Sequence, residues 1–399
     1  MTLLESEIPI NHLLLYHGIL ESEVGESLDA YLAEPSLDNA VLLARALWET
    51  GQSLRDYLIE AVRYDENPFT LAAERGPVSS AMRAAAEHDL YILGKAAQIQ
   101  LPPSLPTPPN EEQTTEWAKS LAVSDDWRPF VEPLAEAIRL GGAGDRGRYF
   151  AFRWESGTLQ GIDHPDPIRL EDLIGNEEAK SLVVRNTEQL LRGLPANNLL
   201  LYGDRGTGKS STVKALVHRF GPEGLRLVEV SRDDANALGA VMRTLQELPQ
   251  KFILFLDDLS FEEAETSYKQ FKAILEGSLE QRPRNVAVYA TSNRKHLIRE
   301  RRSDRLTGGG NDDLNPRDTI EETKSLSDRF GMTIIFSSPD QEQYLEIVSA
   351  LAAQRGIDIP PVELRQQALQ WSLWHNGRSG RTARQFIDDL CGRLGIEVR

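Results

Sequence analysis

The sequence predicts an α/β protein, in which a parallel sheet is covered by helices on both faces and is preceded and followed by helical regions. Two observations carry this prediction. From residue 170 onward, short apolar runs alternate with helix-like segments, as in parallel sheets whose strands are joined by helices. Residues 1–100 instead repeat their apolar positions at helical spacing, and strand-like alternation is absent from them.

The boundaries of these regions follow from breaks in the pattern. Pro35 with Ser36, and Asn67 with Pro68, are expected to separate about three helices within the N-terminal region. The proline-rich LPPSLPTPPNEEQ is poorly compatible with helix and predicts an extended linker. The expected divisions are an acidic helical domain at 1–100, a linker at 101–113, a helix and β-hairpin connector at 114–168, an α/β domain at 169–338 and a helical lid at 339–399.

Ahead of the α/β domain, RYFAFRWESGTLQGI (148–162) alternates around Ser156 and Gly157, which predicts a β-hairpin. Within the lid, Trp371 and Trp374 lie three residues apart and are expected to pack in its core. The runs expected to form buried strands are NLLLYG (198–203), LRLVEV (225–230), KFILFLDD (251–258), NVAVYATSN (285–293) and TIIFSS (333–338), and the helices expected after them are at about 340–355, 362–374 and 380–393.

The chain carries 61 acidic and 44 basic side chains, for a net charge of −17. Residues 1–170 hold 27 of the acidic and 13 of the basic groups, so this part is not expected to bind nucleic acid through its overall field. The single cysteine, Cys391, excludes an intrachain disulfide and a cysteine-based zinc site. No apolar run approaches the roughly 20 residues of a membrane span, and the N-terminus is acidic where a secretory signal is basic. We therefore expect a cytoplasmic protein without membrane insertion.

A glycine-rich loop lies between an expected strand and the helix that follows it. Residues 203–210, GDRGTGKS, match G-x-x-x-x-G-K-[ST], whose glycines let backbone N–H groups surround phosphate oxygens. In that arrangement Lys209 reaches the β- and γ-phosphates, and the Ser210 hydroxyl binds Mg²⁺. A chance glycine-rich turn is the alternative, which the strand–loop–helix context disfavours. The residues expected to bind nucleotide here are Gly203, Asp204, Arg205, Gly206, Thr207, Gly208, Lys209, Ser210 and Ser211.

Polar residues end two further strands at the edge where open α/β sheets bind ligands. Asp257 and Asp258 follow KFILFL; Asp257 suits the Mg²⁺ side, and Asp258 is placed to orient or deprotonate an attacking water. Asn293 ends NVAVYATSN, where its amide can hydrogen-bond the γ-phosphate or the water. The alternatives are a solvated Asp-Asp turn and a polar strand cap, and the phosphate loop upstream disfavours the first of them.

The order of these motifs resembles the AAA+ ATPases. The phosphate loop, the acidic strand end and Asn293 are followed by SDRFG (327–331) and by SGR (379–381), and the similarity covers about residues 169–399. The stretches NNLLLYGDRGTGKSS, YATSNRKHL and SGRTARQF are similar to one family of uncharacterised bacterial AAA+ ATPases. The fold class that this resemblance implies is a P-loop AAA+ core with a parallel sheet and a C-terminal helical lid.

The resemblance also implies ATP and Mg²⁺ as cofactors and assigns further residues. Asn293 matches the family's sensor 1, and Arg329 matches the arginine finger that reaches the neighbouring subunit's nucleotide. An Arg329 paired with a nearby acid is the structural alternative. Arg381 matches sensor 2, with Arg384 one turn later as its rival. The segment Leu173, Ile174, Gly175 resembles the one whose backbone contacts adenine.

Asp258 departs from the AAA+ pattern, in which glutamate usually stands at this place. Aspartate is one methylene shorter, so its carboxylate is expected to lie farther from the attacking water and hydrolysis to be slow. Glu262, four residues on, is a weak alternative acid. Three functions stay open: an oligomeric ATPase that remodels or loads a protein client, a nucleotide-gated assembly scaffold with slow turnover, and a DNA-associated loader.

The partners expected from the resemblance are copies of the chain itself, in a nucleotide-dependent homo-oligomer, and a protein client bound by the N-terminal domain. RKHLIRERRSDR (294–305) holds six Lys or Arg residues in twelve. Such a run suits nucleic acid, which would make the protein a DNA-associated loader. A solvated, subunit-facing surface is the favoured interpretation, because no aromatic residue is interleaved with the charges.

Overall fold

The computed structural model describes residues 8–109, 115–231, 237–259, 283–293, 330–375 and 377–396. The chain forms two compact units, one of Met1–Tyr149 with Leu248–Gln250 and one of the remaining residues. The boundary therefore falls near the start of the segment expected to form the hairpin (148–162). Within the described ranges, every helix is too short or too polar to cross a bilayer.

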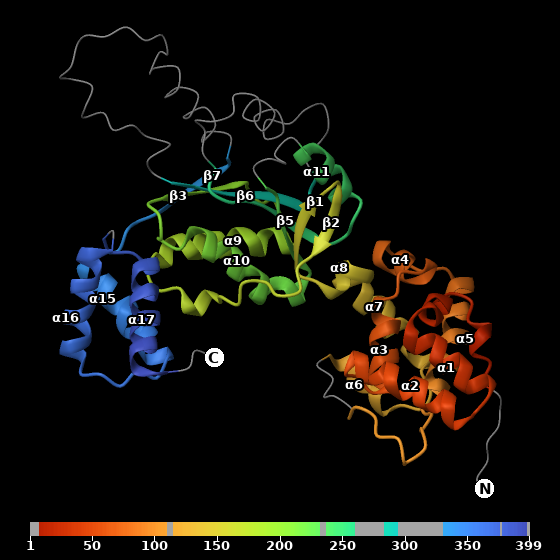
Figure 1. The fold of residues 1–399 in the computed structure, drawn as a ribbon. Coiled ribbons are helices and arrows are strands. Elements are labelled where there is room, and N and C mark those ends of the chain that lie inside the picture. The colour runs from red at the N-terminus through yellow and green to blue at the C-terminus, as the bar shows by residue number, and fades with distance from the viewer. Residues whose placement is uncertain are drawn as a thin grey trace. The chain divides into compact units, whose positions relative to one another are not determined.

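The described part of the N-terminal unit is helical (Figure 1). Five α-helices form within residues 1–100, where the pattern predicted about three, because the chain also breaks at two places other than those expected. The helices are α1 (Glu23–Ala33), α2 (Leu37–Thr50), α3 (Leu54–Tyr64), α4 (Pro68–Arg75), α5 (Ser80–Ala96), α6 (Glu116–Val123), α7 (Val131–Gly141) and α8 (Gly144–Arg148), and short 3-10 turns lie at Ile10–His12, Tyr16–Glu21 and Arg128–Phe130.

Side-chain caps set where these helices begin. The expected break at Asn67 is a capping box, in which the Asn67 side chain accepts from the Thr70 backbone and the Thr70 side chain accepts from the Asn67 N–H. The expected break at Ser36 is also a cap, since its hydroxyl accepts from the third residue of α2. Ser53 and Ser79 cap α3 and α5 in the same way and make the two additional breaks.

Asp89 on α5 anchors the N-terminal segment. Its fully buried carboxylate accepts hydrogen bonds from the backbone N–H groups of Leu14, Leu15 and Tyr16 at 2.7–3.0 Å. These donors begin a 3-10 turn, where the first N–H groups have no partner in the turn itself. The carboxylate therefore fixes the segment against α5.

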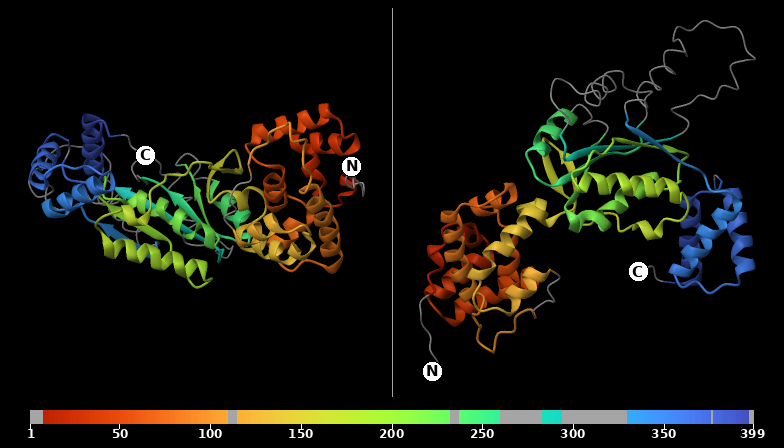
Figure 2. Two further views of the ribbon diagram at one scale, coloured as in Figure 1. Left: turned by 90° about the horizontal axis from the view of Figure 1, so that it is seen from below. Right: turned by 180° about the vertical axis from the view of Figure 1, so that it is seen from behind.

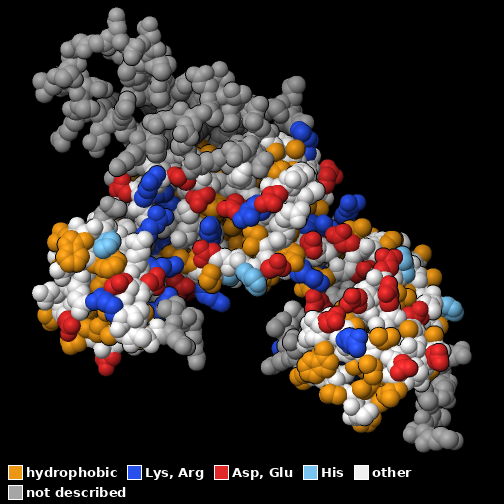
Figure 3. All heavy atoms as spheres, viewed as in Figure 1, with side chains coloured by type: hydrophobic (Ala, Val, Ile, Leu, Met, Phe, Trp, Pro, Cys, Tyr) orange, Lys and Arg blue, Asp and Glu red, His pale blue; other side chains and the backbone are white. Residues whose placement is uncertain are grey.

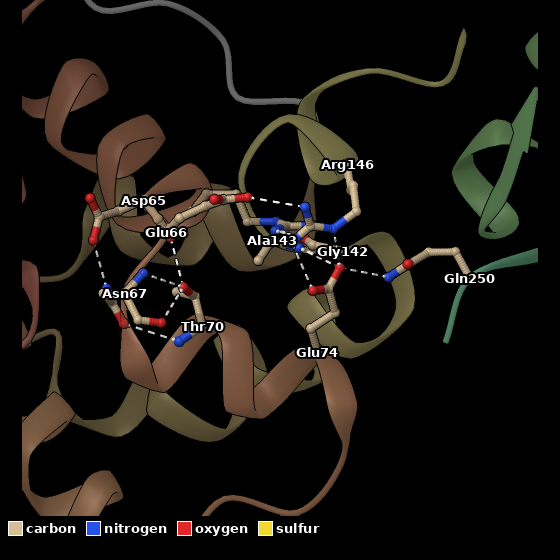
Figure 4. A network of polar contacts seen from close by, with 10 residues as sticks. Asp65, Glu66, Asn67, Thr70, Glu74, Gly142, Ala143, Arg146 and Gln250 are labelled. Atoms are coloured by element: carbon tan, nitrogen blue, oxygen red, sulfur yellow. Dashed lines mark hydrogen bonds and ion pairs between the residues drawn. The ribbon is translucent and has the colours of Figure 1, made fainter. Parts of the chain in front are cut away.

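Glu74 on α4 organises a second buried network (Figure 4). Its carboxylate accepts from the Ala143 N–H at 3.2 Å, from Arg146 Nε at 2.9 Å and from Gln250 Nε2 at 3.1 Å. Arg146 also pairs with Glu66, at 3.2 Å. A buried charge needs such partners, and here the unit supplies all of those named.

Residues 101–109, the described part of the proline-rich segment, form neither helix nor strand. The segment is nevertheless packed, since the Trp48 indole N–H donates to the Pro106 carbonyl at 2.8 Å and Pro108 is buried. The placement of 101–113 as a linker stays a prediction, and residues 110–113 lie outside the described residues.

The second unit is built on a seven-stranded sheet of order β2-β1-β4-β5-β6-β3-β7. Neighbouring strands are parallel except in the β1–β2 hairpin. The hairpin extends the sheet, because β1 pairs with β4. The strands are β1 (Ala151–Glu155), β2 (Thr158–Gly161), β3 (Leu199–Gly203), β4 (Leu225–Glu229), β5 (Lys251–Leu256), β6 (Val286–Asn293) and β7 (Met332–Phe336).

Helices cover both faces of this sheet, so the predicted fold class is confirmed. Helices α9 (Glu177–Leu191) and α10 (Lys209–Phe220) lie on one face, and α11 (Leu238–Gln246) lies on the other (Figures 1 and 2). Leu199 and Leu201 pack with α9 and α10, as expected for alternate residues of one strand. All five residues of β3 are buried, which explains its continuous apolar run.

The lid consists of α15 (Gln341–Gln354), α16 (Pro361–Trp374) and α17 (Gly380–Leu394), close to the expected bounds. Trp371 packs against the lid core, as predicted. The core placement of Trp374 was wrong, because its side chain is 71% exposed at the end of α16. Apolar side chains are visible on the lid surface in Figure 3.

Candidate nucleotide-binding site

The glycine-rich loop joins β3 to α10, as the sequence predicted. Gly206 and Gly208 have φ angles of +77° and +93°, in the left-handed region that favours glycine. Helix α10 begins at Lys209, so its unpaired N–H groups face the loop. The loop therefore has the backbone form of a phosphate cradle.

The lid contacts this loop directly. The Gly380 N–H donates to the Gly206 carbonyl at 3.1 Å. A Cβ atom added at Gly206 would lie 2.8 Å from Ser379 Oγ and 3.2 Å from Arg381 Cβ. Glycine is thus required at 206 both for its backbone angle and for the approach of α17.

Lys209 is held at the floor of the loop. Its ammonium donates to the carbonyls of Gly203 and Asp204, at 2.9 and 2.8 Å, and to Asn293 Oδ1 at 3.3 Å. Burial lowers the pKa of Lys209 to about 8, against the opposing effect of nearby aspartates, and the charge of Arg381 lowers it further. A bound phosphate would add further negative charge beside this desolvated cation.

Ser210, Asp257 and Thr291 bring three side-chain oxygens together. Ser210 Oγ and Thr291 Oγ1 each donate to Asp257 Oδ1 at 2.6 Å. Hydroxyl and carboxylate oxygens are the ligands that Mg²⁺ prefers, and it binds proteins through few of them while keeping several waters. Ser210 and Asp257 therefore have the oxygen ligands that a metal beside the phosphate loop would need, and their role stays a prediction.

Asp258 has an unusual backbone, with φ at +53°. Its N–H donates to Thr291 Oγ1 at 2.8 Å, and its carboxylate accepts a hydrogen bond from Asn293 Nδ2. The β3–β6 register places Asn293 opposite Gly203. Asn293 thus bridges Lys209 and Asp258, the arrangement expected of a residue that aligns an attacking water and its acid.

The proposed base-binding segment lines the same pocket. Lys180, 7% exposed, donates to the Leu173 carbonyl and to Glu177 Oε1, the latter at 2.7 Å. Ile174 packs against the lid core. Leu351 of α15 supplies an apolar wall, which suits a flat base.

The pocket has a volume of about 1080 Å³ and brings most of the predicted residues together. Gly203 and Asp204 do not line it; they support Lys209 from behind. Arg329 and Glu262 lie outside the described residues. The predicted residues on its wall are Leu173, Ile174, Arg205, Gly206, Thr207, Gly208, Lys209, Ser210, Ser211, Asp257, Asp258, Asn293 and Arg381, and the rival Arg384 lines it as well.

Two wall residues have roles that the motifs did not predict. Thr291, two residues before Asn293, was given no role from the sequence, yet it bonds both Asp257 and Asp258. Asn176 stands before a helix, where asparagine predicts a cap, yet its amide bonds Thr207 and Ser337 instead. These partners are distant in the sequence, so no local signal could have identified them.

The α/β core, its glycine-rich loop and the helical lid have the fold of AAA+ P-loop proteins. The model of the family described as "Protein of unknown function (DUF815)" matches residues 147–394. The chain belongs to this family, and the family resemblance predicted from the sequence is confirmed.

Known proteins are similar over parts of the chain. The replication factor C large subunit of Thermofilum pendens is 36% identical over 80 residues, which are 20% of this chain and 19% of that protein, about a fifth of its length. The Thermotoga maritima RuvB Holliday junction branch migration motor is 19% identical, with a TM-score of 0.36, over 58% of this chain and 68% of that one. The FIGL-1 AAA domain in complex with ADP is 18% identical, with a TM-score of 0.40, over 58% and 75%.

Proposed function

We propose that this protein binds ATP with Mg²⁺ and hydrolyses it. One observation carries the proposal: Lys209, the Ser210–Asp257 pair and the Asp258–Asn293 pair converge on one pocket beside a glycine-rich loop. A cation, a metal-binding pair and a carboxylate near a water position are the parts that phosphoryl transfer to water requires.

Each side chain has a part in this reaction. Lys209 neutralises phosphate charge, and Ser210 and Asp257 hold the Mg²⁺, which offsets charge on the β- and γ-phosphates when it is bound. Asp258 orients the water and accepts its proton, while Asn293 aligns Asp258. Arg381, from the lid, faces the same pocket and adds positive charge, with Arg384 one turn away as the alternative.

The second candidate is a nucleotide-gated scaffold that turns over slowly. It is favoured by Asp258, because this carboxylate is short and already accepts a hydrogen bond from Asn293. Substituting Asp258→Glu separates the two functions. A large gain in phosphate release would support the scaffold, and a loss would mean that Asp258 is already tuned for catalysis.

We propose further that the ATPase acts as a homo-oligomer in the cytoplasm, with Arg329 of one subunit stabilising transition-state charge in its neighbour. The N-terminal unit would bind a protein client. Its acidic side chains, visible among apolar ones in Figure 3, suit a basic protein surface. A DNA-associated loader rests on residues 294–305, which lie outside the described residues, and it fails if DNA leaves ATPase activity unchanged at low salt.

Light scattering with and without ATP and Mg²⁺, alongside phosphate release, tests the proposal. The wild type is expected to assemble with ATP and to hydrolyse it, and Arg329→Ala is expected to lose turnover. Arg378→Ala, a change to an arginine that does not line the pocket, is the matched control. A monomer that hydrolyses ATP identically with and without Arg329 would overturn the shared site, and absence of any ATP binding would overturn the ATPase itself.

A further inference from the structure

Asn176 lies between the base-binding segment and α9 and has a backbone that most residues avoid. Its φ and ψ are 53° and 37°, the left-handed conformation, which is costly for a residue other than glycine. Asparagine tolerates this conformation best among the other residues. A conformation of this kind persists only where surrounding contacts stabilise it, and the hydrogen bonds of the Asn176 side chain are such contacts.

The Asn176 side chain makes no helix-cap hydrogen bond, although it occupies the cap position of α9. Ser36 and Asn67, at equivalent places in the N-terminal unit, do cap their helices. A cap of this type stabilises the first turn of a helix. At Asn176 that contribution is absent, and the amide is directed elsewhere.

The amide joins two segments that are far apart in the sequence. Nδ2 donates to the Ser337 carbonyl at 3.1 Å and to the Thr207 carbonyl at 3.4 Å, and Oδ1 accepts from the Ser337 N–H at 2.9 Å. Thr207 belongs to the phosphate loop, and Ser337 lies between β7 and the lid. All three residues line the pocket.

A nucleotide bound in this pocket would contact both of the segments that Asn176 lies between. Its base would lie near Leu173 and Ile174, which precede Asn176 by two or three residues, and its phosphates near Thr207. We infer that Asn176 is a positioning residue, which sets the spacing between the base-binding segment and the phosphate loop and so allows one ligand to contact both. The inference rests on the proposed function, because it concerns the same pocket.

A comparison of ATP with inorganic tripolyphosphate tests this role. Tripolyphosphate needs only the phosphate loop, whereas ATP needs the loop and the base-binding segment at the correct spacing. Asn176→Gly removes the side chain while glycine keeps the left-handed backbone unstrained. We expect its ATP affinity to fall about tenfold, as for the loss of one or two hydrogen bonds, and its tripolyphosphate affinity to stay within about twofold.

Asn176→Asp provides a second variant, because it keeps the acceptor for Ser337 N–H and loses both donated bonds. Its added negative charge should weaken both anions, and its ATP affinity is expected to fall about tenfold more than its tripolyphosphate affinity. Calorimetric titration with each ligand measures this ratio. Unchanged ATP affinity in both variants overturns the inference, and so does an equal fall for both ligands, which would mean that Asn176 only shapes the loop. If the wild type binds neither ligand, the proposed function itself has failed.

Discussion

In the N-terminal unit, the buried carboxylates of Asp89 and Glu74 are surrounded by donors that the unit itself supplies, whereas in the second unit Lys209 and Asp257 lie on the wall of a pocket. The physical requirement is the same, since a buried charge must have partners. The difference is one of access. The first arrangement holds helices together, and the second leaves charge facing a pocket, so burial alone does not determine the role of a charged side chain.

The largest expected effect is the loss of phosphate release when Lys209, the buried charge that faces the pocket, is replaced. Lys209→Met should lower phosphate release about a thousandfold, because it removes the cation beside the phosphate loop. The thermal unfolding midpoint should change by less than about 5 °C, because burial disfavours the charge that is lost.

Lys214→Met is the control for this substitution, since Lys214 is on the same helix and does not line the pocket. Its ATPase activity should match that of the wild type. If Lys209→Met unfolds the protein or retains turnover, Lys209 belongs with the structural charges and the contrast between the units is lost.

The next effect is on the N-terminal unit. Asp89→Ala should destabilise this unit by about 3 kcal/mol, because the buried N–H group of Tyr16 and the part-buried N–H groups of Leu14 and Leu15 lose their acceptor. Hydrogen exchange of the peptide that contains these amides measures the change. Glu87→Ala, at an exposed position of the same helix, should leave the exchange unchanged. Slow exchange in Asp89→Ala would show that the carboxylate is dispensable.

A smaller effect is expected from pH. Because the pKa of Lys209 is lowered to about 8 in the folded protein, from 10.5 in the unfolded chain, the unfolded state holds more protons between these values. The contribution of Lys209 to stability should therefore rise with pH above about 8. Nucleotide affinity should fall in the same range, by up to about tenfold per pH unit, because the ammonium is lost. Titrations at pH 7.5 to 9.5 measure both, and Lys209→Met should show neither trend.

The local parts of the structure were predictable from the sequence. Strand β3 and its loop were predicted because an apolar run and a glycine motif are both contiguous, and the breaks at Ser36 and Asn67 follow from capping residues beside prolines. The pairing of β1 with β4 joins residues about 75 positions apart and left no periodic signal.

The chemistry of the site was predictable in its residue types and less so in its contacts. The sequence placed Lys209, Ser210, Asp257 and Asn293 in one site because their motifs end parallel strands, whose carboxyl ends share an edge. Thr291 bonds both aspartates because of the β5–β6 register and the side-chain rotamers. Neither can be predicted from the residues that surround Thr291 in the sequence.

The hydrogen bonds of Lys209 have a thermodynamic consequence for any ligand. A phosphate oxygen that takes up this ammonium must displace the carbonyls of Gly203 and Asp204 or share it with them. Binding at this lysine is therefore an exchange of acceptors, and the heat released should be small for the number of contacts formed. The affinity would then depend on the charge of the incoming group, which makes the site a discriminator between anions of different valence.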